Sequence, residues 1–271
     1  MKSHEKELLF TLLKTASDNY YGYSSPEFNY TPSFTDDKEE SNVEINEPQT
    51  QELHAEESQK SQVSDNEIEK NPDTGAMTLE TIAQKISECR RCTLCNGRKN
   101  AVPGMGVTNP LVLVIGEGPG EEEDLQGLPF VGPAGQLLDK MLAAINLNRS
   151  SNCYIANTVK CRPPYNRDPE KQEAEACRSF LDAQIHILKP KMILALGKVA
   201  VRNLLKIDGE FALNKYRGQI FEYNGIPLIV TYHPSALLRN IEFKKPAWDD
   251  LKFFKAKLEE ISPEFKMTLG K

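Results

Sequence analysis

Four predominantly apolar runs in the second part of the chain predict the strands of a buried sheet. The runs cover residues 111–115, 154–159, 192–196 and 226–232, and the first of them stops at Gly116. Strands that are apolar on both faces are typical of parallel sheets covered by helices on two sides. We therefore expect these strands to lie at the centre of a folded domain.

Apolar residues recur at three- and four-residue spacings between these runs, which is the pattern of amphipathic helices. The spacing covers residues 137–145 and 177–188, and a third helix is expected over residues 79–86, before Cys89. Strands and helices alternate along the chain. The sequence therefore predicts an α/β fold with a mostly parallel sheet.

The pattern is different in the first 75 residues. Four leucines between residues 8 and 13 line one side of a short expected helix, and periodicity then disappears. The following segment is rich in Glu, Ser, Gln and Asn, so it buries too little apolar surface to offset its chain entropy. We expect residues 1–75 to form an acidic, disordered N-terminal extension that acts as a solvated spacer, and residues 76–271 to form the folded domain. The apolar start of the extension is a candidate docking peptide for a protein partner.

The net charge of −6 is distributed unevenly along the 271 residues. Residues 1–70 contain six Lys or Arg and sixteen Asp or Glu, whereas residues 71–271 contain 27 and 23. The first part thus carries −10 and the second +4. Because the part expected to fold is basic, the acidic total does not exclude a nucleic-acid partner.

The start of the chain predicts its compartment. Charges interrupt the apolar residues near the N-terminus, and no small-residue cleavage site follows, so we expect neither a signal peptide nor a membrane span. This favours an intracellular, cytoplasmic protein that does not associate with membranes. In a reducing compartment, closely spaced cysteines indicate ligation of a metal or cluster before disulfide formation.

The residues that follow three of the predicted strands are candidates for a binding site, because ligands of α/β sheets bind beyond the carboxyl ends of the strands. These segments are Gly116–Asp124, Asn157–Pro164 and His233–Arg239. The first has three glycines at alternate positions but lacks the spacing of a dinucleotide motif and a phosphate-binding lysine. We interpret its glycines as allowing a flat ligand to approach the backbone, with Glu117 nearest to it. The alternative is a tight turn with a solvated acidic face.

Five of the six cysteines are candidate ligands of a metal centre. A C-x-x-C-x-x-C segment lies near residue 90, and two more thiols follow in a distant segment, whereas Cys153 opens a predicted strand and is expected in the core. The five are Cys89, Cys92, Cys95, Cys161 and Cys177. Four thiolates match a tetrahedral zinc site and a [4Fe-4S] cluster equally well by count, and Cys95 is able to replace either cysteine of the pair. The alternative for the pair is two ordinary buried cysteines.

His233 is the histidine that stands where a predicted strand meets a turn, whereas His186 lies in an apolar helix and is expected at the core or its boundary. This position makes His233 the candidate general acid or charge-stabilising group. The alternative is a strand terminus without chemistry. Positive residues near the strand ends favour a groove that follows a phosphate backbone; they are Arg162, Arg167, Arg239, Lys244 and Lys245.

Taken together, these residues resemble the type-four uracil-DNA glycosylases, the iron–sulfur branch of the uracil-DNA glycosylase superfamily. The resemblance covers about residues 79–260, and its motifs follow the order of the family. They are Cys89-x-x-Cys92 with Leu94 and Arg98, Ala101–Gly104, Gly116–Gly120, Glu123–Asp124, Pro129–Gly132, Ala134–Leu138, Asn157–Pro164, Gly197, Arg217–Gly218 and His233–Arg239.

The resemblance implies a three-layer α/β/α sandwich around a short parallel sheet. It implies a DNA repair enzyme, a monomer, that flips uracil out of DNA and hydrolyses its N-glycosidic bond, leaving an abasic site. It also implies a [4Fe-4S] cluster, with Cys89, Cys92, Cys161 and Cys177 as ligands and no ligand at Cys95.

The resemblance further implies the roles of individual residues. Glu117 and His233 are the expected catalytic residues. The expected uracil-binding residues are Gly116, Glu117, Gly118, Phe130, Asn157 and His233, and the expected DNA-binding residues are Pro234, Ser235, Leu237, Leu238 and Arg239. Two other interpretations remain: a protein that binds uracil-containing DNA without turnover, and a catalytically inactive, metal-stapled DNA-binding module.

Overall fold

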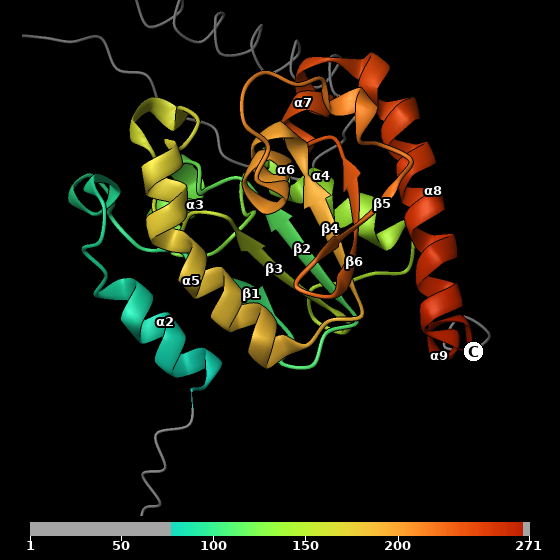
Figure 1. Ribbon diagram of the computed structural model, residues 1–271, viewed down its shortest axis with the longest axis horizontal. Coiled ribbons are helices and arrows are strands. Elements are labelled where there is room, and N and C mark those ends of the chain that lie inside the picture. The colour runs from blue at the N-terminus through green and yellow to red at the C-terminus, as the bar shows by residue number, and fades with distance from the viewer. Residues whose placement is uncertain (1–76, 268–271) are drawn as a thin grey trace, which may run out of the picture. The chain divides into compact units, whose positions relative to one another are not determined.

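The centre of the domain is a mixed sheet of six strands within residues 77–267, the part of the chain that the computed structural model describes (Figure 1). The strands are β1 (Met105–Gly106), β2 (Val112–Gly116), β3 (Cys153–Asn157), β4 (Met192–Leu196), β5 (Ile220–Tyr223) and β6 (Ile226–Thr231). They lie in the order β1-β3-β2-β4-β6-β5. The four inner strands are parallel, and the edge strands β1 and β5 pair antiparallel with their neighbours. The mostly parallel sheet expected from the apolar runs is confirmed.

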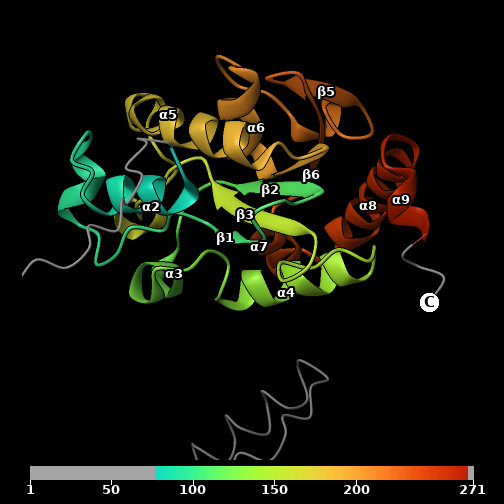
Figure 2. The same cartoon turned by 90° about the horizontal axis from the view of Figure 1, so that it is seen from below.

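Helices cover both faces of this sheet (Figure 2). They are α2 (Leu79–Ser87), α3 (Glu121–Gln126), α4 (Pro133–Ala143), α5 (Lys171–Leu188), α6 (Gly197–Leu205), α7 (Pro234–Arg239), α8 (Lys244–Ile261) and α9 (Pro263–Met267). Along β2, Val112 and Val114 join the apolar cluster that includes α4, α7 and α8, whereas Leu113 and Ile115 join the cluster of α5 and α6. Successive side chains of a strand point to opposite faces, so one strand contributes to two cores. The three-layer α/β/α sandwich is confirmed.

Two predicted element boundaries differ from the structure. The apolar run at 154–159 continues beyond β3, whose partner β2 ends at Gly116; the Thr158 and Val159 amides then donate to the Gly116 and Glu117 carbonyls at 3.0 and 3.2 Å. Helix α5 begins at Lys171, six residues before the expected start. Its first turn is polar and is fixed by the Glu173 carboxylate, which accepts from the Glu170 amide at 2.8 Å, a capping contact that apolar spacing does not detect.

Other predictions concern residues that the structure does not describe. The expected extension over residues 1–75 and its docking peptide lie outside the described residues. Within residues 77–267, no helix has the length and apolar composition that crossing a membrane requires.

Helix α2 packs against α5 and places the cysteine-rich segment beside the sheet. The Thr78 hydroxyl accepts from the Thr81 amide at 3.2 Å and caps the first turn of α2. Ile82 and Ile86 are buried in a third apolar cluster, which also contains Cys161 and Cys177. The segment that follows α2 is thereby held close to the segment that follows β3.

A buried ion pair ties α8 to the sheet. The Arg217 Nε and Nη2 atoms lie 2.7 and 3.1 Å from the two carboxylate oxygens of Asp250, and the Thr231 hydroxyl at the end of β6 donates to the same carboxylate at 2.8 Å. Burial raises the pKa of Asp250, and the bonds from Arg217 and Thr231 oppose this rise. The contact fixes the strand that leads into His233.

Removing the carboxylate of Asp250 should destabilise the domain strongly. In the Asp250→Ala variant the Arg217 guanidinium loses its buried partner, so we expect the free energy of unfolding to fall by about 3–5 kcal/mol. The matched control is Asp249→Ala on the same helix, where an exposed pair with Lys252 is lost and the expected change is below about 1 kcal/mol. Urea unfolding of both variants measures the difference, and equal midpoints would contradict the role assigned to Asp250.

Candidate functional site

All three segments that were selected from the sequence meet at one cavity of about 360 Å³ at the carboxyl ends of the strands. We call it the strand-end cavity. Its lining comprises Glu117, Gly118, Pro119, Gly120, Glu123, Phe130, Ala134, Asn157, Pro163, Asn166, Arg167, Asp168, His233, Ser235 and Arg239. Five of the six expected uracil-binding residues, which include both expected catalytic residues, therefore line this cavity, and Gly116 lies directly behind it.

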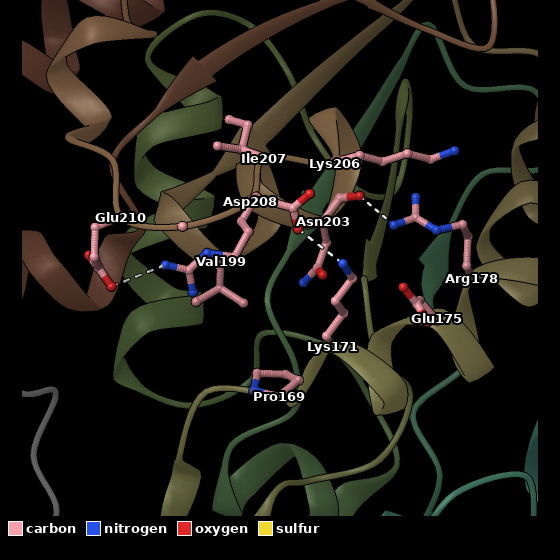
Figure 3. Close-up of a pocket in the computed structure, with 12 residues that line it drawn as sticks. Pro169, Lys171, Glu175, Arg178, Val199, Asn203, Lys206, Ile207, Asp208 and Glu210 are labelled. Carbon is pink, nitrogen blue, oxygen red and sulfur yellow. Dashed lines mark hydrogen bonds and ion pairs between the residues drawn. The ribbon is translucent and has the colours of Figure 1, made fainter.

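A larger cavity of about 670 Å³ lies between α5 and α6, and its charged groups are mostly engaged with one another (Figure 3). Lys171 pairs with Asp208 at 3.0 Å, and Arg178 donates to the Asn203 carbonyl. These contacts satisfy the side chains without a ligand. The strand-end cavity, with its buried polar groups, is the better candidate for chemistry despite its smaller volume.

The Glu123 carboxylate joins the two loops that form one wall of the strand-end cavity. Its oxygens accept from the Gly120 amide at 3.1 Å and from the Val131 and Gly132 amides at 2.8 and 3.0 Å. The neighbouring Asp124 is buried and accepts from the Lys99 amide at 2.9 Å. The acidic face is therefore solvated only in part: Glu121 and Glu122 are exposed, whereas Glu123 and Asp124 hold the backbone of neighbouring loops.

Phe130 is held in an unusual backbone conformation on the floor of the strand-end cavity. Its φ is 54°, a region that non-glycine residues rarely occupy. The Arg149 guanidinium donates to the Phe130 carbonyl at 3.0 Å, and a Cβ at Gly135 would stand 2.0 Å from that same oxygen. The Phe130 ring lies with its centroid 5.5 Å from that of His233. An aromatic face is thus fixed beside the histidine.

Asn157 presents an unpartnered acceptor in this cavity. The side chain is 1% exposed, and its Oδ1 is the one buried side-chain nitrogen or oxygen of residues 77–267 without a hydrogen-bond partner. A Cβ at Gly116 would stand 2.5 Å from this Oδ1 and 2.6 Å from the Phe130 ring. Leaving such an acceptor unpaired costs about 1–3 kcal/mol. The geometry therefore favours a ligand that donates a hydrogen bond to Asn157.

His233 is held as a neutral imidazole. Its Nδ1 accepts from the Ser235 amide at 3.2 Å and lies 2.8 Å from the Ser235 hydroxyl. Because Nδ1 accepts, the proton of the neutral ring is on Nε2. Burial, followed by the nearby positive charge of Arg239, lowers the pKa of His233 to about 4. The ring can therefore donate one hydrogen bond without carrying a charge at neutral pH.

Glu117 is the titrating group of the strand-end cavity. Burial and, to a smaller extent, the negative charge of Asp168 raise the pKa of Glu117, and although Arg239 opposes both effects, the pKa lies at about 7. The Thr158 hydroxyl donates to the Glu117 carbonyl at 2.6 Å and fixes the backbone of this residue. A carboxyl group with a pKa near neutrality is suited to exchange protons or to orient water.

The expected DNA-binding segment divides into buried and exposed residues. Pro234 and Leu237 are buried, Ser235 holds His233, and Leu238 and Arg239 are exposed. Of these five residues, only Leu238 and Arg239 are exposed to solvent. His186 is also exposed, so its expected place at the core or boundary is wrong; it lies on the outer side of α5.

Sequence reasoning missed three residues of this site. Glu123 belongs to a motif of the family resemblance but has no role assigned to it there. Asn166 and Asp168 are not among the candidate residues, although they also line the strand-end cavity. The sequence feature that could have identified Asn166 and Asp168 is their position in the proline-containing segment that follows β3. No apolar pattern indicates that the chain folds back to the cavity there.

A third, small cavity lies between α2 and α5, and we call it the cysteine cavity. Five cysteines line it: Cys89, Cys92, Cys95, Cys161 and Cys177. The Arg98 guanidinium donates to the Cys161 sulfur at 2.9 Å, and the Lys160 amide donates to the Cys177 sulfur at 3.3 Å. Burial raises the pKa of Cys177 to about 11, and that of Cys161 is also raised. Within residues 77–267, no three His, Cys, Asp or Glu side chains are arranged around a point as ligands of a single metal ion.

The chemistry of the cysteine cavity fits an iron–sulfur cluster. Its donors are sulfur atoms alone, and two N–H groups already point at sulfur, a feature that stabilises thiolate ligands. The rest of the lining combines apolar residues, Ile86, Ala176 and Phe180, with two positively charged ones, Arg91 and Lys160. Cys153 is fully buried in the other core, as expected.

Comparison with known proteins agrees with this geometry. Residues 103–252 match the Uracil DNA glycosylase superfamily. The chain is 41% identical over 181 residues to the type-4 uracil-DNA glycosylase of Sulfurisphaera tokodaii, covering 65% of this chain and 82% of the relative. It is 38% identical over 198 residues to that of Archaeoglobus fulgidus, covering 71% and 97%. A type-5 uracil-DNA glycosylase of Pyrobaculum aerophilum is 33% identical over 150 residues, covering 50% and 66%.

The fold and the strand-end cavity define a member of the uracil DNA glycosylase superfamily. Within that superfamily the chain belongs to the type-4 uracil-DNA glycosylases.

Proposed function

We propose that this protein excises uracil from DNA. It flips the nucleotide out of the strand, cleaves the bond between uracil N1 and deoxyribose C1′, and leaves an abasic site. The observation that carries the proposal is the buried Asn157 Oδ1 without a partner. Uracil N3–H is a donor for that oxygen, and uracil O4 is an acceptor for the Asn157 Nδ2, whereas cytosine offers the opposite pattern on this edge.

The other base contacts follow from the shape of the strand-end cavity. The fixed ring of Phe130 offers a stacking face for uracil. Gly116 has no room for a side chain, and Gly118 lies in the wall, so the base can approach the backbone of this loop. Extruding the base costs a few kcal/mol of stacking and pairing. These contacts supply the compensating interactions.

Bond cleavage leaves negative charge on uracil and positive charge on the sugar. The Nε2–H of neutral His233 donates to uracil O2 and stabilises the departing anion. The Glu117 carboxylate stabilises the cationic sugar and orients the water whose hydroxyl joins C1′. The remaining proton of that water neutralises the released base, so atoms and charges balance.

The exposed residues of α7 and its end contact the DNA. Leu238, 51% exposed, is placed to fill the gap that the flipped nucleotide leaves, and Arg239 to contact a phosphate. Pro234, Ser235 and Leu237 hold the segment and the His233 ring in place. Since all residues of the strand-end cavity belong to one chain, the proposed active unit is a monomer bound to uracil-containing DNA.

The proposed cofactor is a [4Fe-4S] cluster held by Cys89, Cys92, Cys161 and Cys177. Its chemistry when bound is to tie segments together through four iron–thiolate bonds, without a redox step. The residues themselves support this role: Cys161 lies four positions after Asn157, and Arg98 and Lys160 donate to two of the sulfurs.

A uracil-excision assay tests the function. Incubation with an oligonucleotide that contains one uracil, followed by alkali, should cleave the strand at uracil and leave a cytosine-containing control intact. His233→Ala should lower the single-turnover rate by about a hundredfold or more, because an oxyanion donor contributes roughly 3–4 kcal/mol. Intact uracil after incubation with the iron-loaded protein would refute the proposal. A denaturant-stable protein–DNA adduct would favour a covalent trap instead.

The rate of excision should depend on pH through Glu117. Its pKa of about 7 means that the carboxyl is increasingly protonated below neutrality. Because the ionised form is required, we expect the rate to fall with decreasing pH below about 7 and to level off above it. Ionisation of His233, at about 4, does not contribute in this range.

Two variants check this assignment. Glu117→Gln should be slow and nearly independent of pH from 5.5 to about 8.5. Glu122→Gln, a change at an exposed acid of the same segment, should keep the wild-type profile. A wild-type inflection that survives in Glu117→Gln would contradict the role of this residue.

The cysteine variants should separate ligands from neighbours. Cys92→Ser and Cys177→Ser should lose iron, sulfide and visible absorbance when purified without oxygen. Cys95→Ser in the same cavity and Cys153→Ser in the core should retain them. Wild-type protein that is colourless and holds zinc on its thiolates would refute the cluster, and loss of iron in Cys95→Ser would refute the ligand set.

A further inference from the structure

Tyr165 occupies a conformation and a position that the fold itself does not explain. It is 100% exposed, more than any other large apolar side chain of residues 77–267. Its backbone has φ 55° and ψ 22°, the left-handed region that disfavours a residue with a Cβ. A strained backbone that presents an unpacked aromatic side chain is found where the side chain has a binding role.

The loop around Tyr165 is rigid. The Asn166 and Arg167 amides donate to the Pro163 and Pro164 carbonyls, each at 3.1 Å. The Arg162 guanidinium donates to the Asn166 side chain at 2.8 Å. These contacts close the turn from both sides, so the exposure of Tyr165 is built into the loop.

The same loop forms part of the rim of the strand-end cavity. Pro163, Asn166 and Arg167, the residues on either side of the turn, all line that cavity. The segment follows β3, whereas Leu238 belongs to the segment that follows β6. Figure 1 shows the segment before α5 and helix α7 at the same end of the sheet, beyond the ends of β2 and β4. The loop that carries Tyr165 and the helix α7 that carries Leu238 thus stand at the same end of the sheet (Figure 1).

We propose that Tyr165 forms a second nucleobase-binding site, which stacks on a base of the DNA strand next to the flipped uracil. This proposal rests on the proposed function, because the strand is brought to the rim by its uracil. Every nucleobase has a flat apolar face, and an exposed aromatic ring beside a base pocket is the group that such a face binds. The guanidinium groups of Arg162 and Arg167 on the same loop are paired with the carboxylates of Glu121 and Glu173 at 3.4 and 2.8 Å, so the Tyr165 ring, and not free positive charge, is the group that binds the strand here.

The positive φ of Tyr165 allows a test that separates DNA binding from stability. In Tyr165→Gly the ring is lost while the backbone strain is relieved, so the melting temperature should stay equal to or rise above that of the wild type. The affinity for a fluorescent single-stranded oligonucleotide with one abasic site, the reaction product, should fall about tenfold, as loss of one stacked base predicts. Tyr165→Phe keeps the ring and should bind within about twofold of the wild type. Ile261→Gly, a change at an exposed residue at the end of α8, is the control for surface truncation.

A second set of oligonucleotides tests the base itself. The base on the 5′ side of the abasic site and the base on its 3′ side are each replaced in turn by a base-free linker. When the base that stacks on Tyr165 is the one replaced, wild type and Tyr165→Gly should bind the oligonucleotide equally. Equal affinity of wild type and Tyr165→Gly for the full oligonucleotide would overturn the proposal, as would a tenfold difference that persists without either neighbouring base. These measurements use binding to the product and do not require turnover. A protein that fails to excise uracil would refute the proposed function, whereas normal excision with unchanged binding in Tyr165→Gly would refute this site alone.

Discussion

The strand-end cavity depends on one carboxylate that binds three backbone amides. Glu123 receives Gly120 from the loop after β2 and Val131 and Gly132 from the loop that carries Phe130. Amides that donate to a charged acceptor form stronger hydrogen bonds than those between neutral groups. The Glu123 carboxylate thus joins the two loops, while Arg149 holds the Phe130 carbonyl and Thr158 holds that of Glu117. The shape of this wall of the cavity depends on these three side chains together.

Asn157 and two residues that line the cysteine cavity, Lys160 and Cys161, belong to one short segment. The buried ammonium group of Lys160 donates to the Asn157 carbonyl at 2.9 Å and to the Gln184 side chain at 2.7 Å, while its amide donates to the Cys177 sulfur. Burial lowers the pKa of Lys160 to about 8, which the negative charge of Cys177 partly opposes. The end of β3 is thereby fixed from the side of α5: the backbone of Asn157 is held, while its side-chain oxygen keeps no partner.

Much of this arrangement could be predicted from the sequence, and the limits have physical reasons. The apolar runs predicted the inner strands because both faces of each strand are buried, and strand ends led to Glu117, Asn157 and His233. Pattern does not show which side of a short helix faces inward. Leu237 and Leu238 look equivalent in sequence, yet one is buried and the other half exposed. Nor does the apolar pattern show that the Glu123 carboxylate binds the amides of Val131 and Gly132, because this contact depends on the conformation of the loop between them. The count of thiols could not distinguish zinc from a cluster, and that choice came from resemblance.

The spacing between Asn157 and Cys161 also restricts how the gene can change. Insertion or deletion of a single codon between them would displace Asn157 relative to Cys161, and the intervening segment could not absorb the shift because Lys160 makes three hydrogen bonds to its surroundings. In contrast, the exposed turn at Gly209, where a Cβ would meet nothing within 4 Å, can vary in length at little cost. Descendants of this sequence should therefore vary in length at the turn around Gly209, whereas the segment between Asn157 and Cys161 should change by substitution alone.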